Sequence, residues 1–83
     1  MNNQIISIIK IQKYLVENGW NISSFDNYLQ KINKEFDGEQ VEIIIPKVEN
    51  LKDYSWRIKD FIKSISTLTD RNFNDIFEEI LNY

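Results

Sequence analysis

Side chains that could bind a metal ion alternate near the end of the sequence, at Asp70, Asn72 and Asn74. This spacing is that of the first three ligand positions of an EF-hand calcium loop. The sixth position of such a loop needs Gly for a sharp turn, and here it is Asp75. The twelfth needs a bidentate Glu, and here it is Leu81. The pattern therefore does not predict a calcium site, and Asn72 and Asn74 are interpreted as residues that begin a helix.

Other groups that carry chemistry are missing or badly spaced. The chain has no His and no Cys, which removes the commonest general base, the thiolate nucleophile and the usual zinc ligands. Glu78 and Glu79 are adjacent, so on a helix they diverge by about 100° and cannot act as an acid–base pair. Gly19 and Gly38 are too far apart to form a phosphate-binding loop. We therefore expect a protein that is not an enzyme and that has no catalytic residues, metal ion or cofactor.

The distribution of charge argues against nucleic acid as a direct ligand. The chain has 83 residues, with 10 Lys and Arg against 13 Asp and Glu, and a net charge of −3. Acidic side chains concentrate in two segments, 35–42 and 70–79, whereas the basic ones are spread along the chain. Non-specific binding to DNA or RNA depends on many contacts between Lys or Arg and phosphates. No dense basic stripe is present, so we expect no direct contact with nucleic acid.

Length and composition predict a single small α+β domain over residues 1–83. A hydrophobic fraction of 42% is too high for an intrinsically disordered chain. The most apolar stretch, residues 5–16, is too short to span a bilayer and is interrupted by Lys10 and Lys13. Because the chain also lacks Cys, and has no Ala for the small-residue cleavage site of a signal peptide, we expect a cytoplasmic protein without membrane contact.

The first predicted element is a helix over about residues 3–18. Asn18-Gly19 predicts its end, because Gly favours the left-handed conformation that follows a helix. Trp20 is interpreted as packing back on the last turn. The apolar stripe expected to be buried follows helical spacing and consists of Ile5, Ile8, Ile9, Gln12, Leu15 and Val16, widened by Ile6 and Ile11.

Residues 21–36 allow two interpretations. Ser24 could cap a helix whose apolar stripe includes Phe25, Tyr28 and Leu29. Alternatively, residues 26–34 form a strand. Asp37-Gly38 is a favoured two-residue hairpin turn, and the β-branched run that follows it is ended by Pro46. That second strand needs a partner for its backbone, and the segment across the turn is the nearest one. We therefore predict a β-hairpin that turns at residues 37–38.

Two helices are predicted after the hairpin. Apolar residues at steps of three and four run from Leu51 to Leu68, with Asn50 as the N-cap and Asp53 in the first turn. Residues 67–71 are expected to connect this helix to a last one that Asn72 caps. The side chains expected to be buried on the first of these helices are Tyr54, Ile58, Phe61 and Ile65. Those expected on one face of the last are Phe73, Ile76, Phe77, Ile80 and Leu81.

Trp56 lies off the apolar stripe of the predicted helix. At 100° per residue it is nearly opposite that stripe, among charged side chains. One interpretation is that the ring lies flat on its own helix beneath Lys side chains, or packs under the N-terminal helix. The other is an exposed binding anchor, because Trp and Arg are common in the hot spots of protein interfaces. The candidate protein-binding residues are Trp56, Arg57, Lys52 and Lys59.

Several short motifs resemble a small α-β-β-α domain that occurs in bacteria, alone or fused to larger proteins, often near phage-defence and other conflict genes. The resemblance covers residues 14–82. It implies the hairpin interpretation of residues 26–45 and brings no catalytic residues with it. The motifs are Tyr14-Leu15, Gly19-Trp20, Asp37 to Pro46, Asp53-Tyr54, Arg57-Ile58 and Asp70-Arg71-Asn72.

These observations predict a helix, a two-stranded hairpin and two C-terminal helices. We expect a non-catalytic protein–protein interaction module, a small subunit or adaptor of a prokaryotic anti-phage defence complex, whose partner is a larger protein. The hairpin edge could also pair with a second copy to form a homodimer. An alternative is a small acidic inhibitor, an antitoxin or a phage-encoded protein, that blocks a nucleic-acid-binding surface through segments 35–42 and 70–79. A third is a minor enzyme subunit whose partner supplies the chemistry.

Overall fold

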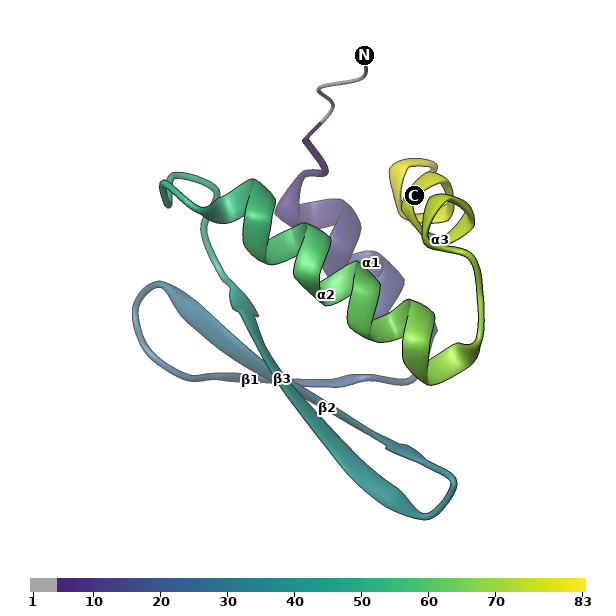
Figure 1. Ribbon diagram of the computed structural model, residues 1–83. Coiled ribbons are helices and arrows are strands. Elements are labelled where there is room, and N and C mark those ends of the chain that lie inside the picture. The colour runs from purple at the N-terminus through teal and green to yellow at the C-terminus, as the bar shows by residue number, and fades with distance from the viewer. Residues whose placement is uncertain (1–4) are drawn as a thin grey trace.

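The computed structural model describes residues 5–83. Its three strands form one antiparallel sheet in the order β1-β2-β3. The helices lie on one side of this sheet (Figure 1). The predicted α+β class is confirmed, but the prediction of only two strands is wrong, because a third strand precedes the hairpin. The elements in chain order are α1 (Ile8–Glu17), β1 (Asn21–Ser24), β2 (Leu29–Phe36), β3 (Glu39–Pro46), α2 (Tyr54–Thr69) and α3 (Phe73–Leu81).

The additional strand, β1, is short and polar. Its residues are all exposed, and Ile22 is its one apolar side chain. It pairs with β2 from Asn21↔Asn33 to Ser24↔Gln30. The loop that follows is held by Asp26, whose Oδ1 accepts hydrogen bonds of 2.8 Å from the backbone N–H groups of Tyr28 and Leu29. This local turn returns the chain to the sheet.

The predicted hairpin between β2 and β3 is confirmed. Phe36 pairs with Glu39, which leaves Asp37 and Gly38 as the two turn residues. Their φ angles are +51° and +85°, as a type I′ turn requires at both central positions. Gly and Asp tolerate this conformation, and the turn sets the register of both strands. Residues 29–36 are therefore a strand, and the alternative helix over residues 25–36 is wrong.

Helix α1 is shorter than predicted. It begins at Ile8 after Ser7, whose Oγ accepts a hydrogen bond from the backbone N–H of Lys10. Residues 3 and 4, which the prediction included, lie outside the described residues. The end of the helix is as predicted. Gly19 has a φ of +81°, and the Trp20 N–H donates to the Leu15 carbonyl over 3.0 Å, which is a Schellman motif.

The buried face of α1 differs from the prediction. Ile11, Tyr14 and Leu15 of this helix are buried. Three aliphatic side chains expected in the buried stripe are instead 62%, 62% and 67% exposed: Ile5, Ile9 and Val16. The sequence places Ile on several sides of this helix, so spacing alone does not identify the side that meets the core.

Helix α2 begins later than predicted. Asp53, not Asn50, is the N-cap, and its side chain makes no capping hydrogen bond. Leu51 therefore lies in the turn before the helix. The helix continues to Thr69, and Asp70 ends it with a left-handed φ of +55°. The connector is thus shorter than the predicted residues 67–71.

Helix α3 begins as predicted. The Asn72 Oδ1 accepts hydrogen bonds from the backbone N–H groups of Asn74 and Asp75, over 2.8 and 3.4 Å. Ile76 and Ile80 are fully buried, and the rest of the predicted face packs against the core with partial exposure. Asn72 and Asn74 therefore belong to the start of a helix, in agreement with their interpretation from sequence.

The core lies between one face of the sheet and the helices. The four residues predicted to be buried on α2, Tyr54, Ile58, Phe61 and Ile65, are at most 3% exposed. The Tyr54 hydroxyl donates a buried hydrogen bond of 2.7 Å to the Ile6 carbonyl. Burial, and then the negative charge of Glu49, raise the pKa of Tyr54 to about 12. Within residues 5–83, no helix has the length and apolar character needed to cross a bilayer.

Candidate protein-binding site

Trp56 stands on the outer face of α2. Its side chain is 68% exposed, the highest value among the large hydrophobic residues of the described chain. The buried residues of α2 follow one stripe, and Trp56 lies about 180° from the centre of that stripe. The helix is anchored by its buried side, so the indole is presented to solvent by a rigid element. The interpretation in which Trp56 packs under α1 is excluded by this exposure.

Charged side chains surround Trp56 on the same face of the helix. Lys59, Asp60 and Lys63 follow it at steps of three, four and seven, and all three are exposed. They leave most of the indole uncovered, and the cation–π contact in the described part of the chain is that of Lys34 over the Phe36 ring. The surface is therefore an aromatic centre with a charged rim. We call Trp56, Arg57, Lys59 and Lys63 the α2 outer face.

Arg57 borders this face and is already paired. Its Nε donates to the Asp53 Oδ2 over 2.8 Å, one helical turn earlier. Both side chains are partly exposed, and ion pairs of this kind contribute roughly 0.2–1 kcal/mol to stability. The pair holds the guanidinium group beside the first turn of α2. Arg57 is thereby positioned at the rim before any partner binds.

Lys52 does not share the helical face of Trp56. It lies in the turn that precedes α2, because the helix begins at Tyr54. The structure thus places Trp56 and Lys59 on one face of α2, with Arg57 at the border of that face. Lys52 lies outside the helix, before its N-cap residue Asp53. The prediction of Lys52 as a neighbour on the same face depended on a helix that began at Leu51, and that start is wrong.

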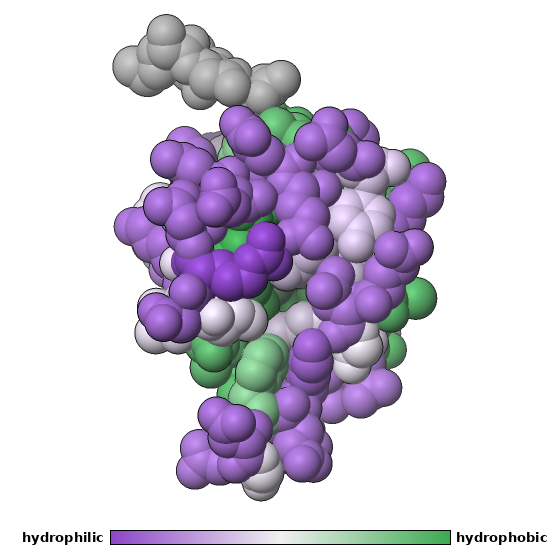
Figure 2. Space-filling view, turned by 90° about the vertical axis from the view of Figure 1, so that its right-hand side faces the viewer, coloured by the Kyte–Doolittle hydropathy of each residue, from purple (hydrophilic) through white to green (hydrophobic). Residues whose placement is uncertain are grey.

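The acidic segments lie at another place on the molecule. The hairpin turn and the connector between α2 and α3 both lie on the right-hand side of Figure 1. Figure 2 looks at this side and shows a mainly hydrophilic surface. Segments 35–42 and 70–79 hold eight of the thirteen acidic residues and one of the ten basic ones, Arg71. Arg71 is bound to Glu79 over 2.8 Å, and this hydrogen bond raises the pKa of the guanidinium group.

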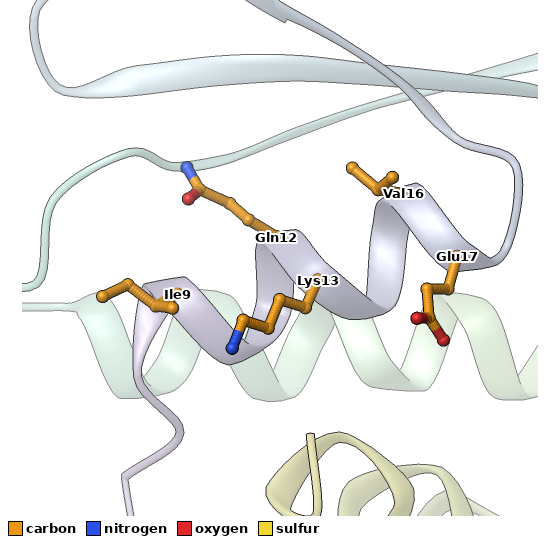
Figure 3. Close-up of a pocket in the computed structure, with 5 residues that line it drawn as sticks. All are labelled: Ile9, Gln12, Lys13, Val16 and Glu17. Atoms are coloured by element: carbon orange, nitrogen blue, oxygen red, sulfur yellow. The ribbon is translucent and has the colours of Figure 1, made fainter.

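A second apolar surface, which the sequence did not predict, lies on α1. The side chains of Ile9, Gln12, Lys13, Val16 and Glu17 line a shallow hollow along this helix (Figure 3). Ile9 lies at one end and Val16 and Glu17 lie at the other, with Gln12 and Lys13 between them. The signal in the sequence is the excess of Ile: five occur in residues 5–11, more than one buried stripe of a helix can use.

No protein-family model, curated protein or solved structure matches the chain. Within the described residues, no three acidic side chains converge in an arrangement that could hold a metal ion. The function is therefore inferred from the geometry and charge of the surface itself.

Proposed function

We propose that this chain is a non-catalytic protein-binding module that docks on a larger protein through the α2 outer face. The observation that carries the proposal is the exposure of Trp56 on a helix whose opposite side is fixed in the core. A rigid aromatic side chain loses little conformational entropy when a partner covers it. The partner would supply an apolar pocket for the indole and acidic side chains for Lys59 and Lys63.

The energy available from Trp56 is large enough for a binding anchor. Covering an exposed indole removes roughly 150 Å² of apolar surface from water, which corresponds to about 4 kcal/mol before the costs of association. Replacing a hot-spot residue by Ala typically weakens the binding free energy of the complex by about 2 kcal/mol or more. The surrounding ion pairs would each add less, because they stay partly solvated at the rim. Trp56 would therefore dominate the affinity, and the Lys residues would set orientation.

The biological setting that we propose is a prokaryotic anti-phage defence complex, of which this chain is a small subunit or adaptor. The support for this setting is the resemblance of residues 14–82 to the bacterial α-β-β-α domain. The proposed binding mode depends only on the surface of α2. The two parts of the proposal can therefore be tested separately.

The test compares Trp56→Ala with the wild-type chain as bait and as purified protein. We expect the melting temperature to be nearly unchanged, because Trp56 contributes little to the core. We expect capture of the partner to weaken by about 2 kcal/mol, or about thirtyfold in Kd. Val16→Ala is the matched control, because Val16 is equally exposed but lies on α1.

Two results would contradict this binding mode. A Trp56→Ala variant that melts far below wild type would show that the indole supports the fold. A variant that is stable and binds the partner as tightly as wild type would show that the anchor lies elsewhere. If Val16→Ala weakens binding instead, the hollow on α1 is the contact surface. The setting is tested by the identity of the captured protein.

The acidic inhibitor is a second candidate, because both acidic segments lie on one side of the molecule (Figure 1). Such a surface would oppose the basic groove of a nucleic-acid-binding protein by charge complementarity. The two functions respond differently to salt. Affinity that depends on exposed charges falls steeply as ionic strength rises, whereas docking through Trp56 falls little. Replacement of Glu39 and Glu78 by Gln would weaken an inhibitor and leave Trp56-mediated docking intact.

A further inference from the structure

Strand β3 has one unpaired edge. In the described chain the sheet has the order β1-β2-β3, so β3 pairs with β2 on one side and with no strand on the other. The strand is eight residues long, and the unpaired side of such a strand is a template for another extended chain. Native proteins bind partners in this way by adding a strand to a sheet edge.

The register identifies the backbone groups that are free at this edge. The Lys47 N–H donates to the Tyr28 carbonyl over 2.8 Å, so these two opposite residues are joined by a hydrogen bond across the hairpin. In antiparallel strands such pairs alternate with pairs that do not exchange bonds. The register of β2 and β3 then directs the backbone groups of Gln40, Glu42 and Ile44 away from β2. These three residues are also exposed, and an added strand could therefore reach them.

An apolar groove runs beside this edge. It is lined by Val41 and Ile43, on the helix-facing side of β3, and by Ser64, Thr67 and Leu68 from the C-terminal half of α2. Leu68, the last residue of the predicted apolar stripe, is 37% exposed and contributes to this surface. Figure 2 shows apolar surface above the projecting hairpin. Alternate side chains of an added strand would enter the groove, because successive side chains of a strand point to opposite faces.

The charge around the edge favours a basic segment as the occupant. Glu39 and Glu42 lie on β3 itself, and Asp37 lies in the adjoining turn. Lys31 is the basic residue in contact with this group, at 3.7 Å from Glu42, and that pair is exposed. Two copies of the chain paired through this edge would place Glu42 of each copy on one face of the joined sheet and Glu39 of each copy on the other, and like charges that lie close together on one face repel. The expected homodimer is thus disfavoured relative to a basic partner.

We propose that the edge of β3 is a strand-addition site for an extended, basic segment of a partner protein. The backbone of that segment bonds to Gln40, Glu42 and Ile44. One set of its alternating side chains fills the groove with Leu68, and the other set carries Lys or Arg toward Glu42. This site consists of β3 and the C-terminal half of α2, whereas Trp56 lies in the first turn of that helix, so the two proposals can be tested independently.

The probe for this site is a synthetic heptapeptide of alternating Lys and Val. It is titrated into the ¹⁵N-labelled chain at low ionic strength, and the backbone amide shifts are followed by NMR. We expect the amide signals of Gln40, Glu42 and Ile44 to shift. N-methylation of one alternating set of peptide nitrogens removes the donors that face β3, and we expect it to weaken binding at least tenfold. N-methylation of the other set should leave the affinity unchanged.

Matched changes test the charge and the groove. A peptide with Gln in place of Lys should bind at least tenfold more weakly, and the Glu39→Gln, Glu42→Gln double variant should lose roughly threefold to tenfold in affinity for the Lys peptide. Leu68→Ser should weaken binding as well, whereas Trp56→Ala should not change it. The chain alone should sediment as a monomer.

Three results would overturn the proposal. One is equal binding of the Lys and Gln peptides. Another is an affinity that neither N-methylated peptide changes. The third is a concentration-dependent dimer whose formation shifts the same three amides, because the occupant would then be a second copy.

Discussion

The hydroxyl group of Tyr54 offers a sharp test of how α2 is held against the segment before α1. It donates a 2.7 Å hydrogen bond to the Ile6 carbonyl, and both residues are buried. Tyr54→Phe keeps the ring in the core and removes only the donor. The Ile6 carbonyl then loses a buried partner, so we expect the free energy of unfolding at neutral pH to fall by about 1–3 kcal/mol.

The same group predicts a pH dependence whose sign follows from its raised pKa. Burial, and then Glu49, raise the pKa of Tyr54 to about 12 in the folded chain, whereas an unfolded Tyr titrates near pH 10. Below about pH 10 the Tyr54 hydroxyl is protonated in both the folded and the unfolded chain, so its hydrogen bond contributes its full stabilisation to the fold. Between about pH 10 and 12 the unfolded chain releases the proton and the folded chain keeps it, so wild type is destabilised. Tyr54→Phe cannot titrate, and the difference between the two proteins therefore shrinks over this window.

Urea denaturation followed by circular dichroism measures both effects. Wild type and Tyr54→Phe are compared at neutral pH and at steps between about pH 9 and 12. Tyr28→Phe is the control, because the Tyr28 ring is exposed and its loss of a hydroxyl should change stability by less than about 0.5 kcal/mol. Equal midpoints for wild type and Tyr54→Phe at neutral pH would refute a stabilising hydrogen bond. A difference that stays constant through the alkaline range would refute the raised pKa.

Three further changes test the fold. Gly38→Val should cost about 1–2 kcal/mol from backbone strain alone, because a Cβ there meets no atom within 4 Å while φ is +85°; an unchanged thermal midpoint would contradict the type I′ turn. Phe61→Ala should cost roughly 3–5 kcal/mol, because the ring is 1% exposed; a variant that melts within a few degrees of wild type would show that this stripe is not the core. Asn72→Ala should lower the free energy of unfolding by about 1 kcal/mol through loss of the α3 cap, which chemical denaturation measures, and Asn74→Ala, with no capping role, should cost less.

The parts of the fold that were predictable depend on local chemistry. The Asp37-Gly38 pair sets the turn, and the β-branched run after it can bury one face only as a strand beside its neighbour. The end of α1 at Gly19 is equally local, because a left-handed residue follows directly from glycine. The Asn72 cap needs only its own side chain and the next backbone N–H groups. In each case the residues that decide the structure are neighbours in the sequence.

The parts that were not predictable depend on contacts between distant segments. Strand β1 contains one apolar residue, so no hydrophobic periodicity in the sequence indicates a strand there. It forms only by pairing with β2, where Asn21 lies opposite Asn33, twelve residues later. The start of α2 could be capped by Asn50 or Asp53, and both types suit an N-cap. The bond between Tyr54 and Ile6, which closes this region, joins residues far apart in the chain.

The candidate site shows the same division. Helical periodicity placed Trp56 opposite the core, and its exposure agrees with that position. Periodicity did not reveal that α1 exposes Ile9 and Val16, because Ile occurs on several sides of that helix. Nor did it reveal the groove at Leu68, which forms only where α2 crosses β3. Surfaces shared by two elements require the packing of both.

Fluorine NMR of the chain labelled with 5-fluorotryptophan measures the proposed contact at Trp56 directly. Such a chain has two resonances, from Trp20 and Trp56, which Trp20→Phe assigns, and an unlabelled partner contributes none. Trp20 is 5% exposed and packs beside Phe36, so it serves as an internal reference. When the protein captured by the wild-type chain is added, we predict that the Trp56 resonance shifts and loses its sensitivity to the H₂O/D₂O ratio, while the Trp20 resonance stays in place. A Trp56 resonance that remains unshifted and solvent-sensitive in the saturated complex would contradict a function based on this residue.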